Sequence, residues 1–488
     1  MATIQMKDDL GKYFKMGARD EEKFEEVARK TLQMPFLERV QSIYFIRQLF
    51  EHVPEYVPPI QRQFWNAKQG KQMVVCYRSN IKDILTHVLN KYKVFTPRLP
   101  GTDGEMKDCI DGDCMKTHKF LKRQPGMFKY RLYVDGADTT NSIGISRSFD
   151  MLYIQVMDLP THLQGRLSTI YFLGVIQKEK DNKNLTLDVW KDIVREMREL
   201  ETIGTTLTLN NEEEHIKACC LMMCGDNKSQ YELGGMPGNF KVDEKQDKKI
   251  CRFCKAQSKE IYACPTTIGP PRHFAHVNRA DNVPDIHVFN SLCAYEESTH
   301  PPYFLVLDFL HDILEGVAPI GFGHILHEMT TFPKYWINFA EINTRIANMP
   351  KTRTDKRDPV KPLSNTCFGA NNRLNLAKGS CYITFMRMFP LVFYNAIPDK
   401  EKQPLFWLAS SLIDVMRLLL RPTQTEASIN RLEHAIEIYF HWHVEEKVKT
   451  LIKHHNLLHY PGIIYYQLFR CCINYPPYGP TTLIPCSL

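Results

Sequence analysis

The sequence predicts an α/β fold with a large helical insertion, and three observations support this prediction. Between residues 128 and 226, aromatic and apolar segments follow the order strand, strand, strand, helix, strand. Residues 236–300 are rich in Gly, Pro, Cys and His and lack a periodic apolar pattern, as is typical of segments that fold around a metal ion. Helical periodicity dominates residues 301–465.

These patterns divide the chain into five regions. A mainly helical N-terminal region precedes the α/β core, and a Cys/His-rich zinc-binding segment and a helical insertion follow it. The last residues carry no helix signal. The expected boundaries are 1–120 for the N-terminal region, 121–235 for the first part of the core, 236–300 for the zinc-binding segment, 301–465 for the insertion and 466–488 for an irregular tail.

The composition is that of a soluble globular protein rather than a membrane protein. The chain has 488 residues and a net charge of +7, which permits nucleic-acid binding without requiring it. Its most apolar stretch, residues 303–323, carries four ionisable side chains, so we expect no membrane span. Fifteen cysteines with no secretory signal indicate reduced thiols, with a metal site among them.

The core prediction depends on five segments. Alternating or aromatic-rich strands are expected at 128–136, 144–159 and 167–177, and a buried central strand is expected at the continuous apolar run 216–226. A helix at 187–200 precedes this last strand. Its apolar residues share one helical face, namely Val189, Trp190, Ile193, Met197 and Leu200.

Two aspartates give this strand order a chemical meaning. Asp135 lies on the first strand and Asp226 follows the last, and neighbouring carboxylates can share Mg²⁺ or Mn²⁺ ions. A pair of such ions can clamp the attacking and leaving oxygens of a phosphodiester. The β-β-β-α-β order with these two acids is the plan of a ribonuclease-H-like nuclease core. The alternative is that both residues only favour turns, since Asp-Gly and Asp-Asn do so.

Four blocks of the sequence resemble the CACTA-type (EnSpm-like) transposases. "LYVDGADTTNSIG" is similar to their first-aspartate block, although Ser142 stands where proline is usual. "MMCGDNKSQYELGG" is similar to the second block, and "DFLHDILEGV" and "KHHNLLHYP" are similar to two later ones. The blocks occur in the family's order over about residues 128 to 465. The resemblance implies a DDE-type transposon protein, in which the ribonuclease-H-like core is interrupted by a zinc-bearing, mainly helical insertion.

A Cys-x-x-Cys pair predicts half of a structural zinc site. Cys251 and Cys254 have the required spacing, and His455 and His459 are four residues apart, so both rings point to one side of a helix. The resemblance implies that these two pairs share one Zn²⁺, with His454 as a substitute ligand. A local finger is the alternative, in which the two cysteines are joined by Cys264 and by either His273 or His276.

The resemblance also implies a third catalytic acid, a glutamate on a helix beyond the histidine pair. No acidic residue follows Glu446, so we expect the family pattern to stop before its last catalytic block. Glu315, in "HDILEG", is the alternative source of a carboxylate. His311 and Glu315 could instead form an ordinary pair within a helix. We therefore expect strand cleavage to be weak or absent.

The expected partner is DNA. A basic loop carries Arg353, Lys356, Arg357 and Lys361, which would contact phosphates without reading sequence. A nuclear protein that forms a homo-oligomer and does not bind membranes fits this expectation. Two functions therefore stay open: metal-dependent DNA cleavage and transfer, incomplete in this chain, and non-catalytic DNA or protein binding on the same scaffold.

Overall fold

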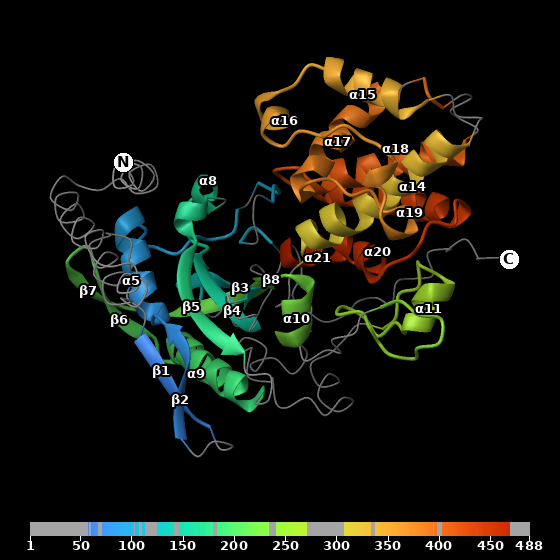
Figure 1. Cartoon of the computed structure of the whole chain (residues 1–488). Helices are drawn as coiled ribbons and strands as arrows, with labels where there is room; N and C mark the ends of the chain where they lie inside the picture. Colours follow the sequence, from blue (N-terminus) through green and yellow to red (C-terminus); the bar gives the residue numbers. More distant parts are fainter. Residues whose placement is uncertain are drawn as a thin grey trace, which may run out of the picture.

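The computed structural model has a mixed α/β unit and a helical unit that lie side by side (Figure 1). Its description covers Val57 and residues 60–66, 71–101, 103–106, 110–112, 124–140, 146–164, 166–178, 183–233, 241–270, 307–332, 337–393, 395–397 and 403–468. None of the helices within these ranges is both long and apolar enough to cross a membrane.

A six-stranded sheet forms the centre of the first unit, in the order β1-β2-β5-β4-β3-β8. The strands β3, β4 and β5 form an antiparallel meander, and β8 runs parallel to β3. A separate two-stranded hairpin, β6-β7, precedes β8. The bounds are β1 Ile60–Asn66, β2 Lys71–Arg78, β3 Phe128–Thr140, β4 Ser146–Val156, β5 Tyr171–Lys178, β6 Thr205–Leu209, β7 Glu212–Ile216 and β8 Ala218–Gly225.

Helix α9 (Lys183–Thr202) packs on the sheet with the apolar face that the sequence predicts. All five predicted residues of that face are buried in one core with the strands. Arg78, at the end of β2, forms ion pairs with Asp192 at 2.7 Å and Glu196 at 2.5 Å, both on α9. Glu196 also accepts the backbone N–H of Ile81, the first residue of α5 (Ile81–Tyr92), at 2.6 Å. One charged network therefore joins α9, β2 and α5.

The structure differs from the predicted domain boundary at residue 121. The hairpin β1-β2 belongs to the same sheet as β3, because β2 pairs with β5. The boundary therefore divides the sheet instead of separating two domains. Short strands with bulges lack the long period that identifies a helix, so no clear periodic signal marks this hairpin. The predicted helices within residues 1–56 lie outside the described residues.

The strand β8 also differs from its prediction as a central strand. Among the described strands, it is the last in the sheet and pairs with β3 alone. Most of its residues are nevertheless buried. The helices α9 and α10 (Asn227–Leu233) contact it. A continuous apolar run thus reports that both faces are covered, and it does not report how many strands lie alongside.

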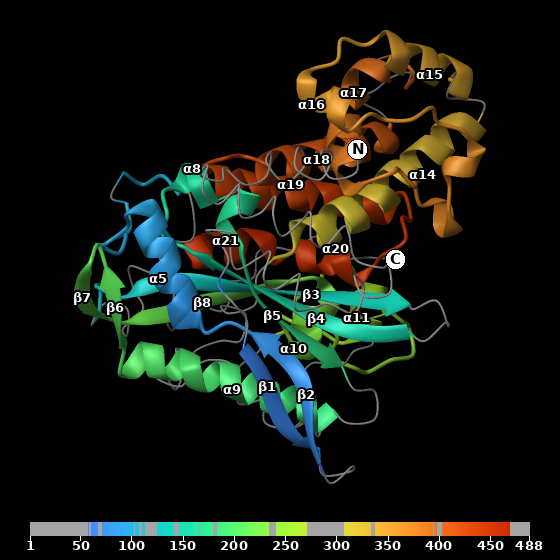
Figure 2. The same cartoon turned by 60° about the vertical axis from the view of Figure 1, so that its left-hand side comes forward.

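The second unit is almost entirely helical, as the sequence predicts for residues 301–465. One apolar core joins its helices, and α20 and α21 lie at the edge nearest the sheet (Figures 1 and 2). Within the predicted zinc-binding segment, the short helix α11 (Ser258–Ala263) follows the two cysteines. The helical bounds are η4 Leu310–Val317, α14 Ala318–Thr331, α15 Phe339–Asn348, α16 Arg353–Arg357, α17 Gly379–Val392, α18 Pro404–Leu419, α19 Glu426–Glu445, α20 Ile452–Leu457 and α21 Tyr460–Leu468.

Candidate metal centre and carboxylate site

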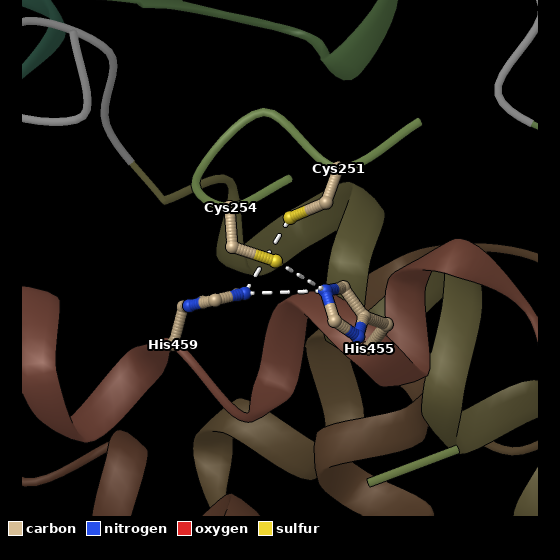
Figure 3. Close-up of side chains that lie close together, drawn as sticks. All are labelled: Cys251, Cys254, His455 and His459. Atoms are coloured by element: carbon tan, nitrogen blue, oxygen red, sulfur yellow. Dashed lines mark hydrogen bonds between the residues drawn. The ribbon is translucent and has the colours of Figure 1, made fainter. Parts of the chain in front are cut away.

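Four side chains from two distant parts of the chain meet at one point (Figure 3). The Cys254 Sγ lies 3.3 Å from the His455 Nε2, and the Cys251 Sγ lies 3.4 Å from the His459 Nε2. The two Nε2 atoms are 3.2 Å apart. All four ligand atoms lie within 4.8 Å of one another, so the cluster could hold a metal ion such as zinc.

These distances fit a tetrahedral zinc site. With ordinary Zn–S and Zn–N bonds, tetrahedral ligand atoms are separated by about 3.3–3.8 Å. Two cysteines and two histidines fill all four positions and leave none for water or substrate. Both cysteines are buried, and His459 is only partly exposed. A metal ion bound here would therefore be structural.

Local structure positions both the cysteine pair and the histidine pair of this centre. On one side, the backbone N–H of Phe253 donates to the Cys251 Sγ at 3.3 Å. The N–H of Ala256 likewise donates to the Cys254 Sγ at 3.5 Å, and such contacts favour thiolates. On the other side, His455 lies on α20 and His459 follows that helix, which keeps the two rings adjacent. An apolar cluster of residues from 250–261, Ile452 and Ile463 surrounds the site.

Two of the alternative ligands, His454 and Cys264, do not belong to this cluster. His454 faces α19, where its ring lies 4.7 Å from that of His443, and its Nδ1 accepts the N–H of Leu451 at 3.0 Å. Cys264 lies after α11, with its Sγ 3.2 Å from the Thr266 hydroxyl. The other two residues of the local finger, His273 and His276, lie outside the described residues.

The register of β3 and β8 aligns the two predicted aspartates. Val134 is the Cα partner of Gly225, and each is followed directly by an aspartate. A Cβ at Gly225 would lie 2.7 Å from the Val134 carbonyl oxygen, so glycine permits this close approach. Asp135 is exposed on β3. Beyond it, β3 continues to Thr140 and stays paired with β4. Asp226 is partly buried, and its Oδ1 accepts the N–H of Ser229 at 2.6 Å.

The π-helical segment η4 brings further ionisable groups to this region. The Asp308 Oδ2 lies 2.7 Å from the His311 Nδ1, and the Glu315 Oε2 lies 3.8 Å from the His311 Nε2. The hydrogen bond to Asp308 raises the pKa of His311 against the opposing effect of burial, and the charges of Asp308, Glu315 and Asp226 add to the increase. Asp226 therefore lies within electrostatic reach of His311 on η4. Single π-helical turns are frequent at functional sites.

The most completely buried acid of the region is Asp312, which no sequence pattern identifies as a functional residue. It is fully buried on η4 and forms an ion pair with Arg252, which is also fully buried. Asn227, Asn456 and Tyr460 also donate to its carboxylate. The blocks quoted above contain Asp312, Asn227, Asn456 and Tyr460, but their residue types do not reveal that the carboxylate is buried.

The four basic residues predicted to contact DNA are all exposed. Three of them lie on or at the ends of α16, a short helix within the segment predicted as a loop, and Lys361 follows it. Asp355 holds this helix in place, because it accepts the N–H of Thr352 at 2.9 Å and pairs with Arg387 at 3.0 Å. The side chains can therefore present positive charge from a fixed position.

Comparison with known proteins adds no relative: no family model matches the chain, and no curated protein matches it significantly. The functional assignment therefore depends on the geometry of the site and on the sequence blocks.

Proposed function

We propose that this chain is a transposon-derived protein of the CACTA (EnSpm-like) class, built on a ribonuclease-H-like core. Three features support the proposal. The β3-β4-β5 meander, α9 and the parallel strand β8 follow the expected strand order. The cysteine pair after β8 meets the histidine pair near the end of the helical insertion. The two sequence blocks with aspartates lie on paired strands, with Val134 of β3 opposite Gly225 of β8.

The observation that carries the proposal is the pairing of Val134 with Gly225. Two carboxylates that follow paired positions of parallel strands offer hard oxygen ligands, which Mg²⁺ and Mn²⁺ prefer. Asp135 is open to solvent and could receive an ion and a phosphate together. Divalent ions at this place would supply charge stabilisation for DNA strand cleavage and transfer.

The third acid of the proposed site limits its activity in strand cleavage. Glu315 is the candidate on η4, where it shares His311 with Asp308. Its backbone carbonyl is held by Arg373 at 3.1 Å and Lys453 at 3.2 Å, so the backbone at Glu315 is fixed. We propose that activity is incomplete and that Glu315 supports only slow strand cleavage.

The test is Mn²⁺-dependent nicking of supercoiled DNA. Asp135→Asn and Asp226→Asn should each abolish nicking and weaken Mn²⁺ binding, as measured by the electron paramagnetic resonance signal of free Mn²⁺. Glu213→Gln, an exposed change on β7, is the matched control and should change neither. Nicking that survives Asp135→Asn, or Mn²⁺ binding that is equal in all variants, would show that the nuclease assignment is wrong.

A second candidate function is favoured by the exposed positive charge of α16. A non-catalytic factor that keeps the scaffold would bind duplex DNA through these phosphate contacts, in the nucleus and as a homo-oligomer. Its affinity would fall steeply with salt. Replacing Arg353, Lys356, Arg357 and Lys361 by glutamine should weaken binding to all sequences alike and flatten the salt dependence. Unchanged DNA binding in this variant would exclude α16 as the interface.

A further inference from the structure

A buried polar cluster connects the metal centre with the carboxylate site. Asp312 lies at its middle with no exposed surface. Its Oδ1 accepts the side-chain amides of Asn227 at 2.8 Å and Asn456 at 3.0 Å. Its Oδ2 accepts from Arg252 at 3.2 Å and from the Tyr460 hydroxyl at 3.4 Å. Four donors thus satisfy one buried carboxylate.

The donors lie directly beside the residues that the two sites need. Arg252 lies between Cys251 and Cys254, and Asn456 lies between the two histidines of the metal centre. Asn227 follows Asp226 at the start of α10. The cluster therefore joins the metal centre to the strand end that carries a proposed metal-binding carboxylate.

Asn227 is the bridge within this cluster. Its amide group donates to Asp312, and its carbonyl oxygen accepts from the Arg252 guanidinium. Arg252 reaches that oxygen from the loop that the two cysteines shape, and its guanidinium lies 4.7 Å from the ring centroid of Phe253. Phe253 in turn lies 5.3 Å from the ring of His459. Arg252 thus packs against a ring that also lies beside a histidine of the metal centre.

Burial makes this arrangement sensitive to the loss of any one partner. A charge pair without solvent is tolerated only when its hydrogen bonds are satisfied, and loss of one partner is strongly destabilising. Arg252 and Asp312 are both fully buried. If the cysteine loop moved, the guanidinium would leave Asn227 and Asp312, and the first turn of α10 would lose its support.

We propose that Asn227 is a positioning residue that couples occupancy of the Cys251–Cys254–His455–His459 centre to the placement of Asp226. An ion in the centre fixes the cysteine loop, the loop fixes Asn227, and Asn227 fixes the preceding carboxylate. The Asp226 Oδ1 already accepts the Ser229 N–H of the same helical turn, so both ends of that turn are held. The part of this inference that concerns Mn²⁺ rests on the proposed function.

The experiment compares zinc-loaded full-length wild type, Asn227→Ala and Lys228→Ala. Lys228→Ala is the matched control, because Lys228 is exposed on the same turn of α10 and its replacement leaves Asn227 in place. Hydrogen exchange of residues 226–231 and Mn²⁺ titration are measured together with zinc content. Asn227→Ala should speed exchange and weaken Mn²⁺ binding by about tenfold, the scale of one lost hydrogen bond to a charged group, with zinc unchanged. Lys228→Ala should resemble the wild type.

Zinc removal by a chelator gives the second arm. In the wild type it should speed exchange at residues 226–231, whereas in Asn227→Ala it should add little. Asn227→Ala that exchanges and binds Mn²⁺ like the zinc-loaded wild type would overturn the coupling. Accelerated exchange in a wild type that never binds Mn²⁺ would support the coupling and contradict the proposed metal chemistry, so the two failures can be told apart.

Discussion

Val134 of β3 and Gly225 of β8 are paired across parallel strands, and an aspartate follows each of them. This pairing brings together two chain positions, each directly before one of two acids that are 91 positions apart (226 minus 135). It depends on the absence of a side chain at Gly225, because a Cβ would lie 2.7 Å from the Val134 carbonyl oxygen.

The first prediction concerns this glycine. Gly225→Ala should push β8 away from β3, and we expect a loss of about 1–3 kcal/mol in the free energy of unfolding, as for other overpacked sites. Mn²⁺ binding should weaken as the two aspartates separate. Gly136→Ala is the control beside Asp135, because a Cβ there would have no atom within 4 Å. Urea unfolding and Mn²⁺ titration check both variants, and equal behaviour would contradict the close approach.

A second glycine tests the contact between η4 and α20. A Cβ at Gly316 would lie 2.9 Å from the His311 carbonyl oxygen and 3.1 Å from the Lys453 Cβ. Gly316→Ala should therefore lower the thermal unfolding midpoint, with a free-energy cost of about 1–3 kcal/mol. Gly126→Ala, in open space, should leave the midpoint nearly unchanged. A midpoint that stays constant in Gly316→Ala would mean that η4 and α20 are not in close contact at Gly316.

The third prediction concerns zinc content. Purified wild-type protein should hold about one zinc per chain, since four ligands complete one tetrahedral site. His455→Ala and His459→Ala should each lower that content and the thermal stability together. His441→Ala, an exposed histidine on α19, should change neither. Elemental analysis checks this, and zinc loss confined to His273→Ala or His276→Ala would instead support the local finger.

The sequence predicted the parts of the fold that have strong periodic patterns. The buried face of α9 and the strands of the meander follow from side-chain alternation, which each segment carries by itself. Position within the sheet does not follow from such patterns, and the end position of β8 illustrates this. The hairpin β1-β2 was missed because its pairing with β5 is a long-range property.

The candidate sites were predictable to different degrees. Ligand chemistry marked Cys251 and Cys254 at once, and the distances confirm their meeting with His455 and His459 as a possible metal centre. The role of Asp312 was not predictable from residue type, because an acid on an amphipathic helix usually faces solvent. Only its burial and its four donors distinguish it.

The last prediction concerns Glu201, near the end of α9, whose side chain is buried away from the two sites. Burial raises the pKa of this carboxyl from its ordinary 4.5 to about 8, against the opposing charge of Arg198. At pH values between 4.5 and about 8, the folded chain keeps a proton on this carboxyl that the unfolded chain releases. Stability from this group is therefore complete at acidic pH and is lost as the pH rises, by up to about 1.4 kcal/mol per unit.

Glu201→Gln should remove this pH dependence and stabilise the protein above the raised pKa of about 8. Glu199→Gln, an exposed change on the same helix, should keep the wild-type slope. Urea unfolding at several pH values across this window measures the difference. If Glu201→Gln and the wild type lose stability in parallel as the pH rises, the carboxyl is ionised in the folded protein and its burial does not control this slope.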